Sequence, residues 1–211
     1  RPLAQLRSSL HMHKAAMVVL VLCSHAAWSD AVEVTDTAHG RIRLQHQLDV
    51  LDDPEHRWTI DDITNSDRAP PFAPIEGQAP LLRVRGGAMW VRLSLTSASA
   101  EPVERFLELA RAELSTVDLF VADSDDQWQR RRTGTTLPFD TRDVSAPNYV
   151  FRLRLEPDAR QTVFLRLVSE RTGIIPVTLW VPEAFFEHER QRQVGLGIFY
   201  GGILSLILFN L

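Results

Sequence analysis

The chain alternates arginine and tryptophan with apolar residues in several short stretches. Trp90 and Arg92 alternate with Met89 and Val91, and Arg166 stands between two leucines in the same two-residue rhythm. In a β-strand this rhythm sends polar and apolar side chains to opposite faces. An indole ring beside guanidinium groups can stack on a sugar ring and hydrogen-bond its hydroxyls or a carboxylate. Trp90, Arg92 and Arg166 are therefore candidates for a ligand-binding surface.

A solvated sheet face explains part of the same pattern without a ligand. Arg152 and Arg154 also alternate with apolar residues. For these two we favour arginines that lie flat over the outer sheet and pair with acidic neighbours. Trp58, Trp128 and Trp180 are expected to pack in the core or at a sheet edge rather than to hold a ligand.

Three nearby aspartates, Asp123, Asp125 and Asp126, offer the hard oxygen ligands that Ca²⁺ prefers. No glycine-kinked loop with a closing glutamate follows them, so a plain turn is favoured over a calcium site. The neighbouring run of three arginines at 130–132 is interpreted as a solvated loop beside these aspartates, not as a polyanion site.

No catalytic constellation is recognisable in the sequence. Nothing singles out a pair of carboxylates for glycosidase chemistry among the 27 acidic residues. The G-x-S-x-G elbow and the glycine-rich phosphate cradle are absent, and the histidines at 39, 46, 56 and 188 lack the spacing of a zinc helix. We therefore predict no enzyme activity for this chain, no cofactor and, apart from the calcium alternative, no metal.

The residues at 194–211 contain no charged side chain. A run of this length suits a membrane-spanning helix, with a buried core helix as the alternative. Its glycines and Asn210 are tolerable because small residues permit close packing against another helix. We expect this segment to be the start of a first transmembrane helix that the sequence truncates, within a larger membrane protein.

The first 29 residues have the layout of a secretory signal peptide. His13 and Lys14 precede an apolar stretch at 15–23, and small residues precede Asp30, where we place the cut. Translation that begins at Met12 would leave a compact signal. A lipoprotein anchor at Cys23 is the less favoured alternative, because bulky Leu22 precedes it.

Export has consequences for charge and redox chemistry. The only cysteine, at position 23, lies in the predicted signal, so the mature chain has neither a disulfide nor a free thiol. The signal holds 3 of the 23 basic residues, and the remaining 20 face 27 acidic ones, a surplus of 7 negative charges. Nucleic acid is therefore not expected as a partner.

Residues 30–186 are predicted to form one mainly β domain, an antiparallel β-sandwich of jelly-roll type. The segment at 52–80, rich in aspartate and proline, is expected to wrap the sandwich with a short element at 59–63. Residues 183–193 read as a polar lead-in helix, with 187–193 next to the membrane. The stretch at 103–115 fits a helix or a strand. Strands are predicted at 41–50, 89–96, 117–121, 149–155, 163–168 and 175–181.

An ordered series of short segments resembles one known family. It covers the chain from about Leu44 to its last residue. The segments are WTIDDI from Trp58, AMWVRL from Ala88, TG from Thr133, LPF from Leu137 followed by Arg142, NYVF from Asn148, FLRL from Phe164, PVTLWVPEAF from Pro176, FYGGI from Phe199 and LFNL from Leu208. Together they resemble the extracellular sensor and first transmembrane helix of bacterial seven-transmembrane receptors with diverse intracellular signalling modules (7TMR-DISM).

The resemblance implies an exported jelly-roll domain, similar in shape to carbohydrate-binding modules, that feeds a seven-helix membrane unit. Its cytoplasmic output is commonly a diguanylate cyclase or a histidine kinase. Arg142 joins Trp90, Arg92 and Arg166 as a candidate ligand-binding residue, because all four fall among the segments that carry the resemblance.

The predicted function is a periplasmic sensor in the inner membrane that binds a small, carbohydrate-like ligand. The alternative is a periplasmic interaction domain that forms a homodimer or binds a protein partner without a small ligand.

Overall fold

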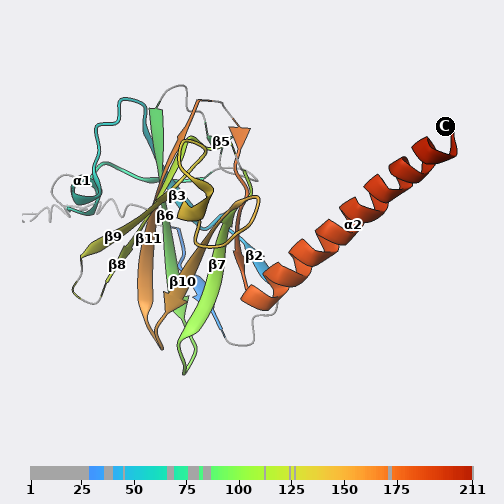
Figure 1. Cartoon of the computed structure of the whole chain (residues 1–211). Helices are drawn as coiled ribbons and strands as arrows, with labels where there is room; N and C mark the ends of the chain where they lie inside the picture. The colour runs from blue at the N-terminus through green and yellow to red at the C-terminus, as the bar shows by residue number, and fades with distance from the viewer. Residues whose placement is uncertain are drawn as a thin grey trace, which may run out of the picture.

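The computed structural model describes residues 29–35, 40–44, 46–65, 69–75, 81–82, 87–111, 113–123, 125, 127–170 and 173–210. The predicted signal peptide lies outside these ranges except for Ser29, and so does Asp126. Figure 1 shows a β-sandwich from which one long helix projects away on one side.

A large sheet forms one layer of the sandwich. Its strands are antiparallel to their neighbours, except that β1 (Val32–Val34) pairs in parallel with β6. Along the sheet the other strands follow the order β4 (Ala73–Pro74), β3 (Leu48–Asp53), β6 (Gly87–Ser97), β11 (Arg160–Ser169), β8 (Thr116–Ala122) and β9 (Trp128–Thr133).

A smaller antiparallel sheet forms the second layer. Its spatial order is β10 (Tyr149–Leu155), β7 (Val103–Leu109), β13 (Val177–Trp180) and β2 (Arg41–Arg43). A separate two-strand ladder joins β12 (Gly173–Ile174) to β5 (Leu81–Leu82). A short 3-10 helix, η1 (Phe139–Thr141), precedes β10.

The two sheets enclose the main core. Residues at every second position supply it, as the alternation predicts: Val91 and Leu165 from the large sheet, Leu107 and Phe151 from the small sheet, all at most 1% exposed. Burying one such side chain contributes about 1.5–3 kcal/mol, so this layer is the main source of stability.

Each sheet also has an apolar cluster on its outer face. The helix α1 (Ile60–Thr64) covers the large sheet through Ile63, and its N-terminus is closed by a capping box between Thr59 and Asp62. The helix α2 (Pro182–Phe209) begins with a proline, whose fixed φ suits a first helical turn, and its Phe185 packs on the small sheet. Figure 1 accordingly shows α1 and α2 on opposite sides of the sandwich.

The mainly β prediction is confirmed, and the strand order is compatible with a jelly roll. The undecided stretch at 103–115 contains strand β7 and no helix in its described residues. Residues 41–50 do not form one strand, because they divide between β2 in the small sheet and β3 in the large one. The arginine run at 130–132 is not a loop, because it lies within β9, where it pairs with β8.

Candidate ligand-binding site

The outer face of the large sheet carries its polar and aromatic residues in two adjacent rows across five strands. Directly paired positions on antiparallel strands point the same way, so each row is contiguous in space. The first row is Leu51, Trp90, Arg166, Asp118 and Arg132; the second is Asp49, Arg92, Phe164, Phe120 and Arg130. Three of the four sequence candidates, Trp90, Arg92 and Arg166, thus lie together.

Trp90 is 1% exposed and lies in the apolar cluster on this face. Its ring stacks on that of Phe120 at 5.5 Å, and its Nε1 donates to Asp53 Oδ2 at 3.3 Å. The segment around α1 covers it, because Ile63 belongs to the same cluster. In this structure Trp90 is a packing residue, and its ring is closed to a stacking ligand.

Arg92 and its acidic partner lie beside Trp90. The Arg92 guanidinium donates from Nε and Nη2 to Asp49 Oδ2, at 3.1 and 2.9 Å, and lies 4.7 Å from the Phe72 ring centroid. Its side chain is 14% exposed, and that of Asp49 is 5% exposed. The pair fixes the guanidinium in place at the edge of the apolar cluster.

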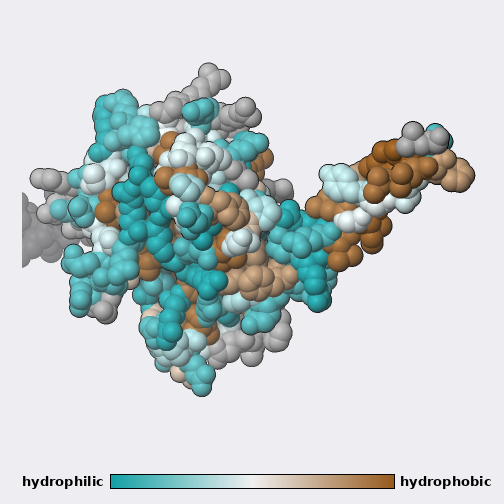
Figure 2. Space-filling model, in the orientation of Figure 1, coloured by the Kyte–Doolittle hydropathy of each residue, from teal (hydrophilic) through white to brown (hydrophobic). Residues whose placement is uncertain are grey.

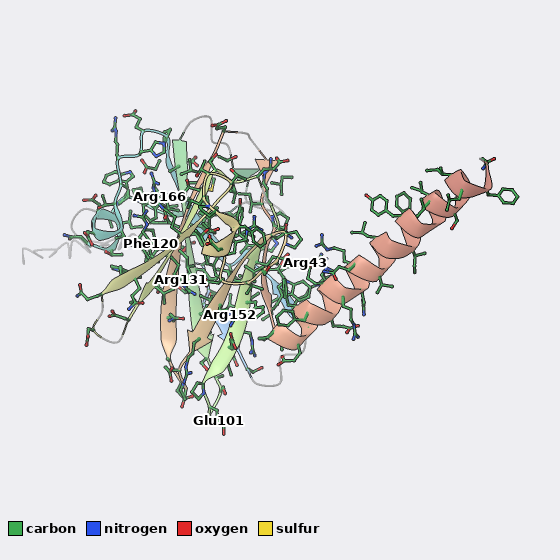
Figure 3. The ribbon with its side chains drawn as sticks, viewed as in Figure 1. Arg43, Glu101, Phe120, Arg131, Arg152 and Arg166 are labelled. Atoms are coloured by element: carbon green, nitrogen blue, oxygen red, sulfur yellow. The ribbon has the colours of Figure 1, made fainter. Side chains whose placement is uncertain are left out.

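Arg166 belongs to a second charged group on the same face, centred on Asp118. The Asp118 side chain is 1% exposed and lies 2.9 Å from Arg130 Nε, 3.0 Å from Arg132 Nη2 and 3.9 Å from Arg166 Nη1. Hydrogen bonding to Asp118 raises the pKa of Arg132. Figure 3 shows Arg166 near Phe120 on this face.

Arg142 lies apart from the other three candidates, in the loop before β10. Its Nη1 donates to the backbone carbonyls of Pro147 at 2.9 Å and Asn148 at 3.4 Å, and also to that of Ala146. The guanidinium lies over the Tyr149 ring, 4.7 Å from its centroid. Burial raises the pKa of Tyr149. Through these contacts Arg142 stabilises the conformation of its own loop.

A groove of about 600 Å³ opens at one end of the outer face of the large sheet. This volume lies within the range of small-molecule sites. Trp128 and Phe164 supply aromatic surface, with their ring centroids 5.3 Å apart and the rings nearly perpendicular. The polar lining residues include Arg92, Arg154, Glu156, Arg160, Gln161 and Thr162. Arg92 is the sequence candidate that the structure places in this groove.

Trp128 and Phe164 line the groove but are not among the ligand-binding residues predicted from the sequence. Phe164 is an aromatic residue at an outward-facing position of its strand, where the pattern otherwise places polar residues. This exception could have identified it as a candidate from the sequence. The sequence around Trp128 does not indicate a groove residue, because its strand is mostly polar. Its location at the groove depends on the pairing of β9 with β8.

The turn after β8 contains the aspartates considered for calcium. Asp123 Oδ1 accepts hydrogen bonds from the backbone N–H groups of Asp125 and Gln127, both at 2.9 Å. Those bonds lower the pKa of Asp123, with that from Gln127 the largest cause. Among the described residues there is no group of three metal-capable side chains, and Asp126 lies outside them.

The outer face of the small sheet meets α2. Phe185 is 2% exposed and contacts the rings of Phe106 and Trp180, with centroids 5.6 and 6.0 Å apart. Glu108 accepts from Trp180 Nε1 at 2.7 Å and from Asn148 Nδ2 at 2.8 Å. The first turns of α2 are therefore fastened to the sandwich.

From Gln191 to Phe209 every residue of α2 is exposed. The helix is long and apolar enough to cross a membrane, and its apolar part is not buried. Figure 2 shows the change from hydrophilic residues next to the sandwich to hydrophobic ones along the far part of the helix.

The chain is thus a β-sandwich with a groove on one outer face, followed by a helix that is long and apolar enough to cross a membrane. The model of the 7TMR-DISM extracellular 2 family matches residues 45–181, more than half of the chain, and the protein belongs to this family. It is thus an extracellular sensor domain of a membrane receptor, and the family is not one of enzymes. No curated protein matches the chain in sequence.

Proposed function

We propose that the groove on the large sheet binds a small, hydroxyl-rich ligand of carbohydrate type, and that the domain reports its occupancy through α2. The domain would lie in the periplasm, with α2 in the inner membrane. The signal would pass to a seven-helix membrane unit and then to a cytoplasmic output such as a diguanylate cyclase or a histidine kinase.

The composition of the groove is the observation that carries the proposal. Its aromatic surface comes from Trp128 and Phe164, and its rim alternates bases and acids, including Arg154, Glu156 and Arg160. Aromatic rings stack on the apolar faces of sugars, while charged and amide groups hydrogen-bond the hydroxyls around them. Arg92 lines the groove, and its pair with Asp49 fixes the position of its guanidinium there.

Transmission requires the two outer faces to be coupled. The groove lies on the large sheet and α2 docks on the small sheet, with the main core between them. Close-packed cores respond to strain as units, so a shift in one sheet changes how the other presents Phe185. A ligand with a tenfold preference for one state supplies about 1.4 kcal/mol to this shift.

Dimerisation without a small ligand is the competing proposal, and one edge strand argues against it. At β10 the Arg152 backbone N–H donates to Asp143 Oδ2 at 3.2 Å, and its carbonyl accepts from Arg131 Nη1 at 2.8 Å. Both groups would otherwise be open to a strand from a second copy. Figure 3 shows Arg131 and Arg152 close to each other.

A thermal-shift panel on the detergent-solubilised chain tests the proposal. The panel contains neutral mono- and disaccharides, uronic acids and amino acids, each titrated to saturation. We expect at least one neutral sugar to raise the melting temperature saturably, because a ligand that binds only the folded state stabilises it. Trp128→Ala should abolish that rise.

Phe139→Ala is the matched control, because Phe139 is 57% exposed and does not line the groove. It should keep the full ligand response. A panel with no saturable response, or a response that survives Trp128→Ala undiminished, contradicts the assignment of the groove. Sedimentation of the same sample at several concentrations tests the competing proposal. A dimer that forms without any ligand would support it.

A further inference from the structure

A second hollow lies on the opposite side of the sandwich, where the outer face of the small sheet meets the beginning of α2. Its volume is about 400 Å³. Arg41 and Arg43 of β2, Glu108 of β7, Trp180 of β13 and Arg192 of α2 contribute to its walls. Figure 3 shows Arg43 beside the first turns of α2. This hollow shares no lining residue with the groove.

Three arginines and two glutamates line the hollow, which leaves a surplus of one positive charge. Arg192 pairs with Glu189 at 2.7 Å, and both carboxylate oxygens of Glu108 accept hydrogen bonds from Trp180 and Asn148. Within the ranges that the structure describes, neither Arg41 nor Arg43 forms an ion pair. Arg41 lies over the Trp180 ring, 5.3 Å from its centroid.

The helical wall of the hollow lies at the depth of lipid headgroups. His188 and Arg192 line the hollow six and two positions before the uncharged run, which begins at Val194. At 1.5 Å per residue this wall extends from about 3 to about 9 Å beyond the run along the helix axis. The headgroup layer on each side of a bilayer is about 5–8 Å thick. With the uncharged run in the hydrocarbon, the hollow faces the membrane surface.

The lead-in turns of α2 contribute no net positive charge, and their third glutamate, Glu183, does not line the hollow. Glu187 pairs with Arg190 and Glu189 with Arg192, each at a spacing of three residues. The net positive charge at the junction therefore comes from β2, an edge strand of the small sheet. A basic strand next to a membrane helix is suited to an anionic headgroup, because guanidinium groups bind phosphate through paired hydrogen bonds.

We propose that this hollow binds the phosphate of an anionic phospholipid, with Arg41 and Arg43 as the residues that hold it. The lipid would clamp the sandwich to the membrane beside α2 and restrict the orientation of the domain. This site is independent of the groove, so its failure leaves the proposal of a sugar ligand untouched.

The test uses the full chain in nanodiscs with equal amounts of phosphatidylcholine and phosphatidylglycerol. Native mass spectrometry after release measures which lipid remains bound. We expect preferential retention of phosphatidylglycerol, and at least a fivefold loss of that preference in the double variant Arg41→Gln/Arg43→Gln. Equal retention of the two lipids by the unaltered chain would overturn the proposal.

The matched control is Arg57→Gln/Arg152→Gln, which removes the same charge from two residues that line neither the hollow nor the groove. It should keep the preference, and an equal loss in both double variants would show a diffuse charge effect and contradict a site. Melting curves confirm that both variants fold. In detergent without lipid, inorganic phosphate should leave the melting temperature unchanged; a saturable rise that the Arg41/Arg43 variant lacks would assign the hollow to free phosphate instead.

Discussion

Asp118 holds three arginine side chains with a single buried carboxylate. Its side chain is 1% exposed, whereas Arg130 and Arg132 are each 43% exposed and Arg166 is 17% exposed. The charge is stable there because hydrogen-bonded guanidinium groups replace the water that burial removes. The sequence shows these arginines but not their common partner, which only strand pairing identifies.

Replacing Asp118 by alanine should lower the free energy of unfolding by about 3 kcal/mol, because it leaves the arginines without their buried partner. Chemical denaturation of the two proteins measures this difference. The control is Glu156→Ala, whose pair with Arg154 is exposed. Its loss should cost less than about 1 kcal/mol. Equal effects of the two substitutions would show that the Asp118 group does not stabilise this face.

Asp123 gives the turn after β8 a dependence on pH. Its folded pKa is lowered from 3.8 by backbone hydrogen bonds, so it stabilises the fold above the unfolded value and loses that effect as the pH falls below it. Asp123→Ala should lower the melting temperature at pH 7, and the difference from the unaltered chain should shrink below about pH 3.8. A difference that stays constant down to pH 3 contradicts this explanation.

At the scale of elements, α2 has two environments along one helix. Phe185 is buried among Phe106 and Trp180, whereas Val194 and the residues after it are exposed along the free part of the helix. A continuous helix transmits rotation or tilt of its docked turns to its far end, because its backbone hydrogen bonds keep it stiff. The docking of Phe185 thus joins the apolar part of α2 to the sandwich.

Phe185→Ala should destabilise the domain by about 3 kcal/mol, because it removes a buried ring and leaves a cavity. It should also expose the junction at 181–190 to protease before the sandwich unfolds, which limited proteolysis with peptide mapping measures. Phe186→Ala is the control, since Phe186 is 54% exposed, and it should produce a smaller effect on both readouts. Identical digestion of both variants and the unaltered chain argues against a docked α2.

For the whole molecule, the sequence predicts the fold more completely than it predicts the ligand-binding site. Alternation around Met89 and Leu165 identified the inner faces correctly, because a two-residue period is a local property of the backbone. It also placed Trp90, Arg92 and Arg166 on one outer face. The environments of these residues depend on contacts distant in sequence: the cover over Trp90 comes from α1, and Trp128 reaches the groove through pairing with β8.

The position of the sandwich relative to the membrane can be measured directly, and we expect it outside the membrane that α2 enters. Glu101→Cys in a Cys23→Ser background introduces one thiol at an exposed position of the sandwich, at its tip in Figure 3. Intact spheroplasts that express the chain are treated with a membrane-impermeant maleimide. We expect full labelling before lysis and no further labelling afterwards. A thiol that reacts only after the membrane is broken contradicts it.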